Sequence, residues 1–313
     1  PTEGAGGASP SGSPNHSRVS RLVCTTVAAF YDLVRAPFPP VVRIETTNAC
    51  NARCTICPHE RMRRPTQRMD DRLFAAIIRE CGQHRCREVH LHNFGEPLLD
   101  KRLESMVAMA KKAGVRRVKI FTNGSLLSHD RAKGLIAAGL DEIKISFDGA
   151  SAAEFERIRQ PLRFEQVVAN IHELVALRNA AGSPLRIAAT CCSTSDKGAT
   201  MAALERIVDR FHFDRIHNWS GEQGRPVNQG IRKPCSRLWR TLTILADGQV
   251  SLCCLDYDGQ VRLGQVSVAD GANAGQGIAA IWRSGAFSPV RRCHARARQD
   301  EMPLCAGCSK SFL

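Results

Sequence analysis

Three cysteines stand close together early in the chain, in the pattern Cys50-x3-Cys54-x2-Cys57. They follow an extended run at residues 41–47, so one short loop can offer three thiolates to one metal centre. A closed zinc or iron–sulfur site takes four ligands, so a three-cysteine loop leaves one position open for an outside ligand. The open coordination position predicts a catalytic metal centre and not a purely structural one. The alternative is a structural zinc loop completed by His59.

A second group of cysteines lies near the end of the chain. It consists of Cys235, the adjacent pair Cys253-Cys254, and the pair Cys305-x2-Cys308. With one member of the adjacent pair, these residues supply four thiolates, a full set for a closed [4Fe–4S] cluster or a zinc ion. Clustering of cysteines at metal-ligand spacings predicts reduced thiols in a reducing, cytoplasmic compartment.

Short apolar runs alternate with longer amphipathic stretches between these two groups. Strands are predicted at 41–46, 88–92, 117–121, 142–146, 186–190 and 215–218, and helices at 70–81, 101–113, 128–138, 164–180 and 200–211. The alternation predicts an α/β fold with a parallel sheet, right-handed crossovers and ligands at the carboxyl ends of the strands.

Several polar residues and one glycine occur where the predicted strands end. They are Gly95, Glu96, Asn123, Ser146 and Arg159. Gly95 allows close backbone approach, while Asn123 lies in a Thr-Asn-Gly sequence that fits either a simple turn or a ligand contact. Asp148 is predicted either to cap the next helix or to contact the substrate.

The two ends of the chain differ from the middle. Residues 1–21 are rich in Gly, Ser and Pro and are predicted to be a disordered tail, followed by a helix at 21–36 outside the first strand. A barrel domain is predicted over 22–219, a linker over 220–234 and a small second domain over 235–313. That domain starts with a hairpin of two runs, 241–245 and 249–252.

The lengths of the apolar runs and the distribution of charge argue against two classes of partner, membranes and nucleic acids. The 313 residues carry a formal net charge of +14, and no apolar run approaches the roughly 20 residues of a membrane span, so no membrane partner is predicted. Basic residues are spread over helix faces without interleaved aromatic residues, so no nucleic-acid partner is predicted either. A metal-stabilised RNA-binding protein remains the non-enzymatic alternative.

These motifs resemble the radical S-adenosylmethionine (SAM) superfamily. The resemblance implies a partial (β/α)6 barrel, with Cys50, Cys54 and Cys57 holding a [4Fe–4S] cluster whose free iron binds the amino and carboxylate groups of SAM. It further implies that Glu96 accepts from the SAM ammonium and that Ser146 and Arg159 hold its ribose and carboxylate. Gly95, Asn123 and Ile56 complete the expected SAM contacts, with Ile56 where the family usually has an aromatic residue.

The second cysteine group resembles the SPASM/twitch auxiliary-cluster domain, including a tryptophan helix at 278–284. The resemblance implies one auxiliary [4Fe–4S] cluster held by Cys235, Cys253, Cys305 and Cys308, because the Gly-x4-Cys register from Gly248 selects Cys253. Adjacent strand residues point to opposite faces, so Cys254 is left as a free thiol beside the barrel mouth. It is either a small buried hydrophobe or a hydrogen-atom donor to a substrate radical.

The overall pattern most resembles radical SAM enzymes that act on aminoglycoside sugars. The resemblance implies an epimerase in antibiotic biosynthesis that works with a small-molecule substrate and an electron donor such as flavodoxin or ferredoxin. Dehydrogenation of an aminocyclitol and modification of a peptide are the enzymatic alternatives. An aminoglycoside is a polycation, so this substrate requires acidic residues at the mouth of a +14 protein. The candidates are Glu45, Asp148, Asp256 and Asp258.

Overall fold

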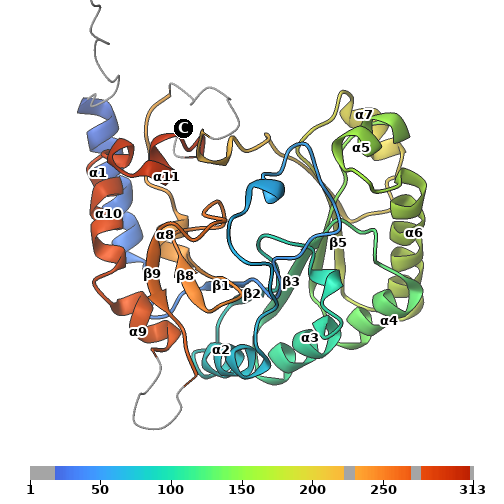
Figure 1. The fold of residues 1–313 in the computed structure, drawn as a ribbon, viewed down its shortest axis with the longest axis horizontal. Helices are drawn as coiled ribbons and strands as arrows, with labels where there is room; N and C mark the ends of the chain where they lie inside the picture. The colour runs from blue at the N-terminus through green and yellow to red at the C-terminus, as the bar shows by residue number, and fades with distance from the viewer. Residues whose placement is uncertain (1–17, 222–229, 269–275, 311–313) are drawn as a thin grey trace, which may run out of the picture.

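A single curved sheet organises the chain (Figure 1). The structure, a computed structural model, describes residues 18–221, 230–268 and 276–310. The strands are β1 (Val41–Ile44), β2 (Glu88–His90), β3 (Arg117–Thr122), β4 (Glu142–Ser146), β5 (Arg186–Cys191), β6 (Arg210–Phe213), β7 (Thr241–Ile244), β8 (Gln249–Ser251) and β9 (Arg262–Gln265). Their order across the sheet is β6-β5-β4-β3-β2-β1-β7-β8-β9.

Strands β1 to β6 pair in parallel and in chain order, which confirms the predicted open α/β barrel. The predicted hairpin is also present, as the antiparallel strands β7 and β8, joined by β9. β7 pairs in parallel with β1, so the hairpin continues the barrel sheet instead of standing apart from it. The predicted linker at 220–234 lies partly outside the described residues.

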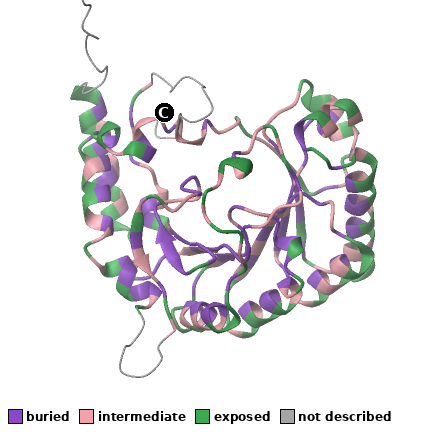
Figure 2. Cartoon of the chain, viewed as in Figure 1, coloured by how far each residue is buried: buried purple, intermediate pink, exposed green. Residues whose placement is uncertain are grey.

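Helices such as α2 (Asp71–Gln83), α3 (Leu103–Lys112), α4 (His129–Ala137) and α6 (Phe164–Ala180) cover the outer face of the sheet, whereas the turn η1 (His59–Arg61) lies inside its curve (Figures 1 and 2). The other helices are α1 (Arg18–Leu33), α5 (Ala152–Ile158), α7 (Lys197–Ala202), α8 (Arg237–Arg240), α9 (Ile278–Arg283), α10 (Phe287–Ala295) and α11 (Pro303–Ala306), with further short 3-10 turns η2 (Pro97–Leu99), η3 (Trp219–Gly221) and η4 (Gln299–Glu301). No helix among the described residues is long and apolar enough to cross a bilayer.

Side chains along each strand alternate between the helix-covered outer face of the sheet and its inner face. Val42, Val89, Val118 and Ile143 are fully buried and belong to the core between sheet and helices. Their neighbours in sequence point the other way, into the curve of the sheet, because successive strand residues alternate. The inner face of this barrel is therefore lined by the second set of each strand, which is mostly polar.

The last barrel unit differs from its prediction. The expected helix at 200–211 and strand at 215–218 are wrong, since α7 ends at Ala202 and β6 occupies 210–213. Glu205 and Arg206 have φ values of 45° and 56°, which no helix accommodates. Phe211 and Phe213 then pair with Ala189 and Cys191 of β5.

The N-terminal helix also lies elsewhere than predicted. α1 runs beside α10 of the C-terminal region (Figure 1), where Thr25 Oγ1 donates to the Ala295 carbonyl at 3.2 Å. Asp32 accepts from Trp239 Nε1 at 2.7 Å. Residues 18–21 of the predicted disordered tail are helical, and residues 1–17 lie outside the described residues.

Candidate active site with two cysteine centres

The loop that follows β1 carries the first three cysteines and lies inside the curve of the sheet (Figure 1). Its backbone is tied to other elements: Arg53 N–H donates to the Gln160 carbonyl at 2.6 Å, and Thr55 N–H to the Ile158 carbonyl at 2.9 Å. The buried Asn48 side chain closes the loop base, accepting from Gln67 N–H at 2.7 Å. The loop is thus held before any ligand binds.

The thiols of this loop suit a multi-iron cluster. Burial raises the pKa of Cys50 to about 11 and of Cys57 to about 12, so a metal must supply the energy that keeps them ionised. The Arg159 guanidinium lies 3.6 Å from Cys54 Sγ and partly offsets its burial. Within the described ranges, no three His, Cys, Asp or Glu side chains are grouped closely enough for a single ion. Three soft thiol donors in one loop fit a [4Fe–4S] cluster with one open iron.

His59 does not point to a zinc loop. Its Nε2 is 2.7 Å from the Asn48 carbonyl, and its ring stacks on Phe94 with centroids 5.3 Å apart. The hydrogen bond and the stacking use the imidazole to brace the loop, so the structure gives no support to the alternative of His59 as a fourth ligand.

Gly95 is required by close packing against the cysteine loop. A Cβ at this position would lie 2.6 Å from the Thr47 carbonyl oxygen and 2.8 Å from that of Ala49. The next residue, Glu96, donates its N–H to the same Ala49 carbonyl at 2.8 Å. The glycine that the sequence placed near SAM therefore serves first to seat the segment after β2 against the loop.

The Glu96 carboxylate accepts three hydrogen bonds within the protein. It accepts from Thr122 Oγ1 at 2.6 Å, Asn123 N–H at 2.7 Å and Leu98 N–H at 3.0 Å. Burial raises its pKa despite these donors. An ionised carboxylate offers about four acceptor sites, so one remains for the predicted SAM ammonium.

We expect Glu96→Gln to lower the free energy of unfolding of the apo chain by about 1–3 kcal/mol, because the amide nitrogen would face one of these buried donors. Denaturant unfolding followed by circular dichroism measures the change. Glu173→Gln is the matched control, since the Glu173 side chain is 44% exposed and pairs with the exposed His129. Equal stability of the two variants would contradict this role.

Asn123 joins the turn after β3 to the cysteine loop. Its Nδ2 donates to Asn51 Oδ1 at 2.9 Å, and its Oδ1 accepts from Ser125 N–H at 3.0 Å. Asn51 in turn donates to Ser125 Oγ at 3.0 Å. Both predicted readings of this turn thus remain compatible with the geometry, which places Asn123 at the mouth of the barrel.

Arg159 is buried and pairs with Asp148, which accepts from Arg159 Nε at 2.7 Å. The other Asp148 oxygen accepts from the N–H groups of Cys192 and Ser193 at 2.5 and 2.7 Å. The predicted helix-capping role of Asp148 is therefore wrong, because Ser151 caps α5. Ser146 ends β4 beside Thr190, and its predicted partnership with Arg159 in holding SAM remains a prediction.

An aromatic group at the barrel mouth was not predicted. Phe94 stacks on Tyr257 with centroids 4.8 Å apart, and Trp219 meets both rings edge-on. Trp219 Nε1 also donates to the Ile56 carbonyl at 2.8 Å, so the group covers the loop next to Cys57. The signal in the sequence was Phe94, a large aromatic residue directly before Gly95 and shortly after a predicted strand.

The second cysteine group gathers around α8 and α11. Burial raises the pKa of Cys235 and Cys253, and that of Cys305 to about 12. Arg237, at the start of α8, lies among them, and negative charge on Cys254, Cys235, Cys253 and Cys308 raises its pKa. Three of the predicted ligands, Cys235, Cys253 and Cys308, thus lie near this buried cation, and Cys305 lies near Cys308 and Cys235. Four thiols grouped in this way fit a closed iron–sulfur cluster.

His294 connects two of the predicted ligands. Its Nδ1 accepts from the Cys235 N–H at 3.2 Å, which leaves the proton on Nε2, 3.4 Å from Cys305 Sγ. The side chain is fully buried, and burial together with Arg232 lowers its pKa to about 4, so the ring is neutral. An N–H group aimed at a ligand sulfur stabilises the more negative, reduced cluster.

We expect His294→Phe to lower the reduction potential of the auxiliary cluster by about 20–60 mV, which corresponds to one hydrogen bond of about 0.5–1.5 kcal/mol. Potentiometric titration monitored by electron paramagnetic resonance measures it. His129→Asn, an exposed change on α4, serves as the control and should leave the potential unchanged. An unaltered potential in His294→Phe at full iron content would contradict the assignment.

The adjacent cysteines differ in their surroundings. Cys253 Sγ accepts from Leu255 N–H at 3.4 Å and lies near Cys235. Cys254 contacts Arg43 of β1, on the inner face of the barrel; although burial opposes it, Arg237 and Arg43 lower the pKa of Cys254 to about 7. Both thiols also lie near Cys235 and Arg237, so the predicted division of roles between them stays a prediction.

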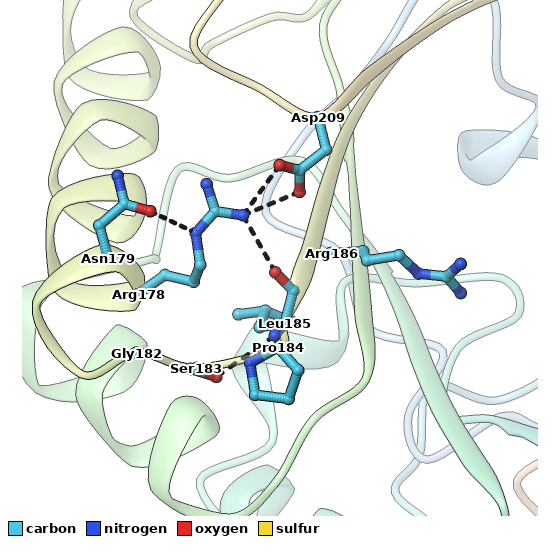
Figure 3. A pocket seen from close by; sticks show the side chains of 8 residues that line it. All are labelled: Arg178, Asn179, Gly182, Ser183, Pro184, Leu185, Arg186 and Asp209. Carbon is cyan, nitrogen blue, oxygen red and sulfur yellow. Dashed lines mark hydrogen bonds and ion pairs between the residues drawn. The ribbon is translucent and has the colours of Figure 1, made fainter.

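A pocket of about 530 Å³ lies away from these centres, at the amino end of β5 (Figure 3). Arg178 crosses it and bonds the Asp209 carboxylate at 2.9 Å and the Leu185 carbonyl at 3.1 Å. Arg186 points to the other face of the strand, where it pairs with Glu142. The pocket is therefore a braced turn between α6 and β5, not part of the site.

Two family models match the chain. The radical SAM superfamily model matches residues 44–182, and the SPASM iron–sulfur cluster-binding domain matches residues 235–309. GTP 3',8-cyclase of Chlorobaculum tepidum is 36% identical over 136 residues, 43% of this chain and 41% of that protein. GTP 3',8-cyclase of Mycobacterium sp. strain KMS is 27% identical over 269 residues, 71% and 74% of the two chains. The first match thus spans about two fifths of that relative's length.

Solved structures share the fold. BtrN in complex with AdoMet and 2-DOIA superposes with a TM-score of 0.61 at 19% identity, covering 87% of this chain and 96% of that one. Streptococcus suis SuiB bound to the precursor peptide SuiA gives 0.62 at 11% identity, with 85% and 69% covered. At these identities the likeness concerns architecture alone.

Proposed function

This chain belongs to the radical SAM superfamily and carries a C-terminal SPASM domain, and from that premise we propose that it inverts a carbon of a small-molecule substrate. The observation that carries the proposal is the contact of Cys254 with Arg43 of β1. Both adjacent thiols lie near Cys235, but Cys254 also hydrogen-bonds Arg43 on the inner face of the barrel, whereas Cys253 Sγ accepts from Leu255 N–H. A thiol on the inner face of the barrel can donate a hydrogen atom to a substrate radical that is bound there.

The cofactors are a SAM-binding [4Fe–4S] cluster, an auxiliary iron–sulfur cluster and SAM. Cys50, Cys54 and Cys57 would hold the first cluster, and Cys235, Cys253, Cys305 and Cys308 the second. When bound, SAM and its cluster supply the radical chemistry that removes a hydrogen atom from an unactivated carbon. Residues of the chain exclude water, with Phe94, Trp219 and Tyr257 covering the loop, and position the bond that breaks.

Cys254 completes the inversion in this proposal. Its S–H bond breaks, the hydrogen atom joins the substrate carbon from the opposite face, and a sulfur radical remains. One electron and one proton restore the thiol, the electron coming from a small redox protein such as flavodoxin or ferredoxin. The substrate is neither oxidised nor reduced overall.

The four acidic residues that were expected to bind an aminoglycoside are already paired within the protein. Glu45 accepts two bonds from Arg64, at 2.9 and 3.0 Å, and Asp148 is paired with Arg159. The remaining two candidates are also engaged, Asp256 by the backbone N–H groups of residues 260 and 261 and Asp258 by Arg63. With all four carboxylates already bonded, we do not propose a polycationic substrate.

Dehydrogenation is the second candidate, because the pKa of Cys254 lies near 7. A thiolate has no S–H hydrogen to return, so the substrate radical would lose an electron and a proton and become a ketone. The relatives named GTP 3',8-cyclase make ring closure on a nucleotide a third candidate.

The test is anaerobic incubation of the reconstituted chain with SAM and dithionite in deuterated water, against a panel of sugar phosphates, sugar acids and aminoglycosides. We expect 5′-deoxyadenosine and methionine, and an epimer that contains one solvent deuterium. A ketone without deuterium would favour the second candidate, and absence of SAM cleavage would overturn the proposal.

A further inference from the structure

Inward-pointing residues of the central strands form a basic floor beneath the barrel mouth. Strand register places Arg43 of β1 beside His90 of β2, and His90 beside Lys119 of β3. Neighbouring strands are about 4.8 Å apart, so these three side chains lie within reach of one small group. His92 and Lys144 stand one level nearer the mouth. We call these five residues the floor: Arg43, His90, His92, Lys119 and Lys144.

The ion pairs of the floor leave positive charge uncompensated. Lys119 lies 3.5 Å from Glu88 and 3.2 Å from Glu142, and Lys144 shares Glu142 at 3.8 Å. Glu88 also pairs with Arg117, and Glu142 also pairs with Arg186. No ion pair in the described part of the chain includes Arg43. Glu88 and Glu142 therefore face five cations: Arg43, Lys119, Lys144, Arg117 and Arg186. Asp214 and Arg210 add one charge of each sign near Lys144, so the surplus stays positive.

Burial and the surplus positive charge together lower the pKa of the neighbouring basic side chains. Burial, followed by the charges of Arg43 and Lys119, outweighs Glu88 and lowers the pKa of His90 to about 4. The same two cations add to burial in lowering the pKa of His92. The pKa of Lys144 is lowered too, by burial and by Lys119 although Glu142 opposes. Such a positive field attracts an anion.

Unused polar atoms point to the same conclusion. Arg43 Nε, His90 Nδ1 and His92 Nδ1 are buried without a hydrogen-bond partner among the described residues. Each histidine is only 9% exposed, and the rings stack 5.4 Å apart. Buried polar atoms are rarely left unpaired, so three on neighbouring strands indicate a missing ligand.

We propose that the floor binds an anionic group of the substrate, a phosphate or a carboxylate. The proposal rests on the proposed function, because it assumes that the substrate enters this barrel. Anchoring the anion at Arg43 places the rest of the substrate beside Cys254, which contacts the same guanidinium. The anion would let both imidazoles take up a proton and donate to it from Nδ1.

The test is calorimetric titration of the reconstituted full chain with pyrophosphate, and separately with malonate to represent carboxylates. We expect saturable binding that weakens about tenfold in Arg43→Gln and in Lys144→Met, the loss expected for one charge-assisted hydrogen bond. Lys133→Met, an exposed lysine of α4, is the matched control and should bind like wild type. Stronger binding of pyrophosphate identifies a phosphate group, and stronger binding of malonate a carboxylate.

Thermal unfolding separates a ligand site from a structural role. Arg43 has no carboxylate partner to leave stranded, so Arg43→Gln should keep or raise the apo melting temperature. A clear fall in melting temperature, no saturable binding of either anion, or equal weakening in Lys133→Met would overturn the proposal. SAM cleavage without substrate is assayed on the same samples. Absence of cleavage in the wild-type chain would contradict the proposed function, whereas the anion titration would still show whether the floor binds an anion.

Discussion

Cys57→Ala abolishes SAM cleavage in our expectation and lowers iron from about eight to about four atoms per chain, because one of two [4Fe–4S] clusters is lost. Cys57 is the most deeply buried thiol of its loop, and two remaining thiols cannot hold a cluster that already lacks a fourth protein ligand. Iron and sulfide assays of the anaerobically reconstituted chain, together with chromatography of 5′-deoxyadenosine, measure both effects.

Cys24→Ala is the matched control for this variant. Cys24 is a fully buried thiol outside both cysteine groups, and its sulfur lies 3.4 Å from the Arg232 carbonyl. Its replacement should lower stability modestly and leave iron content and SAM cleavage intact. Full iron content in a folded Cys57→Ala chain would show that the loop does not hold the cluster.

The second large effect is expected for Cys254→Ala. Without the S–H group, hydrogen abstraction continues but the substrate radical is not quenched, so 5′-deoxyadenosine still forms while epimer and solvent deuterium disappear. Mass spectrometry of products from turnover in deuterated water measures the change. Iron content should stay at the wild-type value, because the proposal assigns the fourth ligand of the auxiliary cluster to Cys253 and the contact with Arg43 to Cys254.

Cys253→Ala is the paired experiment. Loss of this predicted ligand should remove about four iron atoms, the auxiliary cluster, while SAM cleavage at the first cluster persists. The reverse pattern, with iron lost in Cys254→Ala and kept in Cys253→Ala, would exchange the two roles. Undiminished deuterated epimer from Cys254→Ala would exclude this thiol as the hydrogen donor.

Local patterns in the sequence determined much of this protein. The spacing of Cys50, Cys54 and Cys57 predicts one shared centre because residues in one short loop cannot lie far apart. Apolar periodicity predicted five of the six barrel strands to within about two residues. It failed after α7, where the positive φ values of two residues ended the helix early. Such a break depends on the chain's return to β5 and leaves no periodic signal.

Only the tertiary structure decided which distant residues meet. Strand register brought Arg43, His90 and Lys119 into one row, and packing of α10 against α8 carried His294 to the backbone N–H of Cys235. Asp148 was read as a helix cap because its local sequence allows one, but it pairs with Arg159 and two backbone N–H groups of the next loop. The physical reason is that register and crossover geometry set contacts between residues tens of positions apart, where a single sequence carries no periodicity to reveal them.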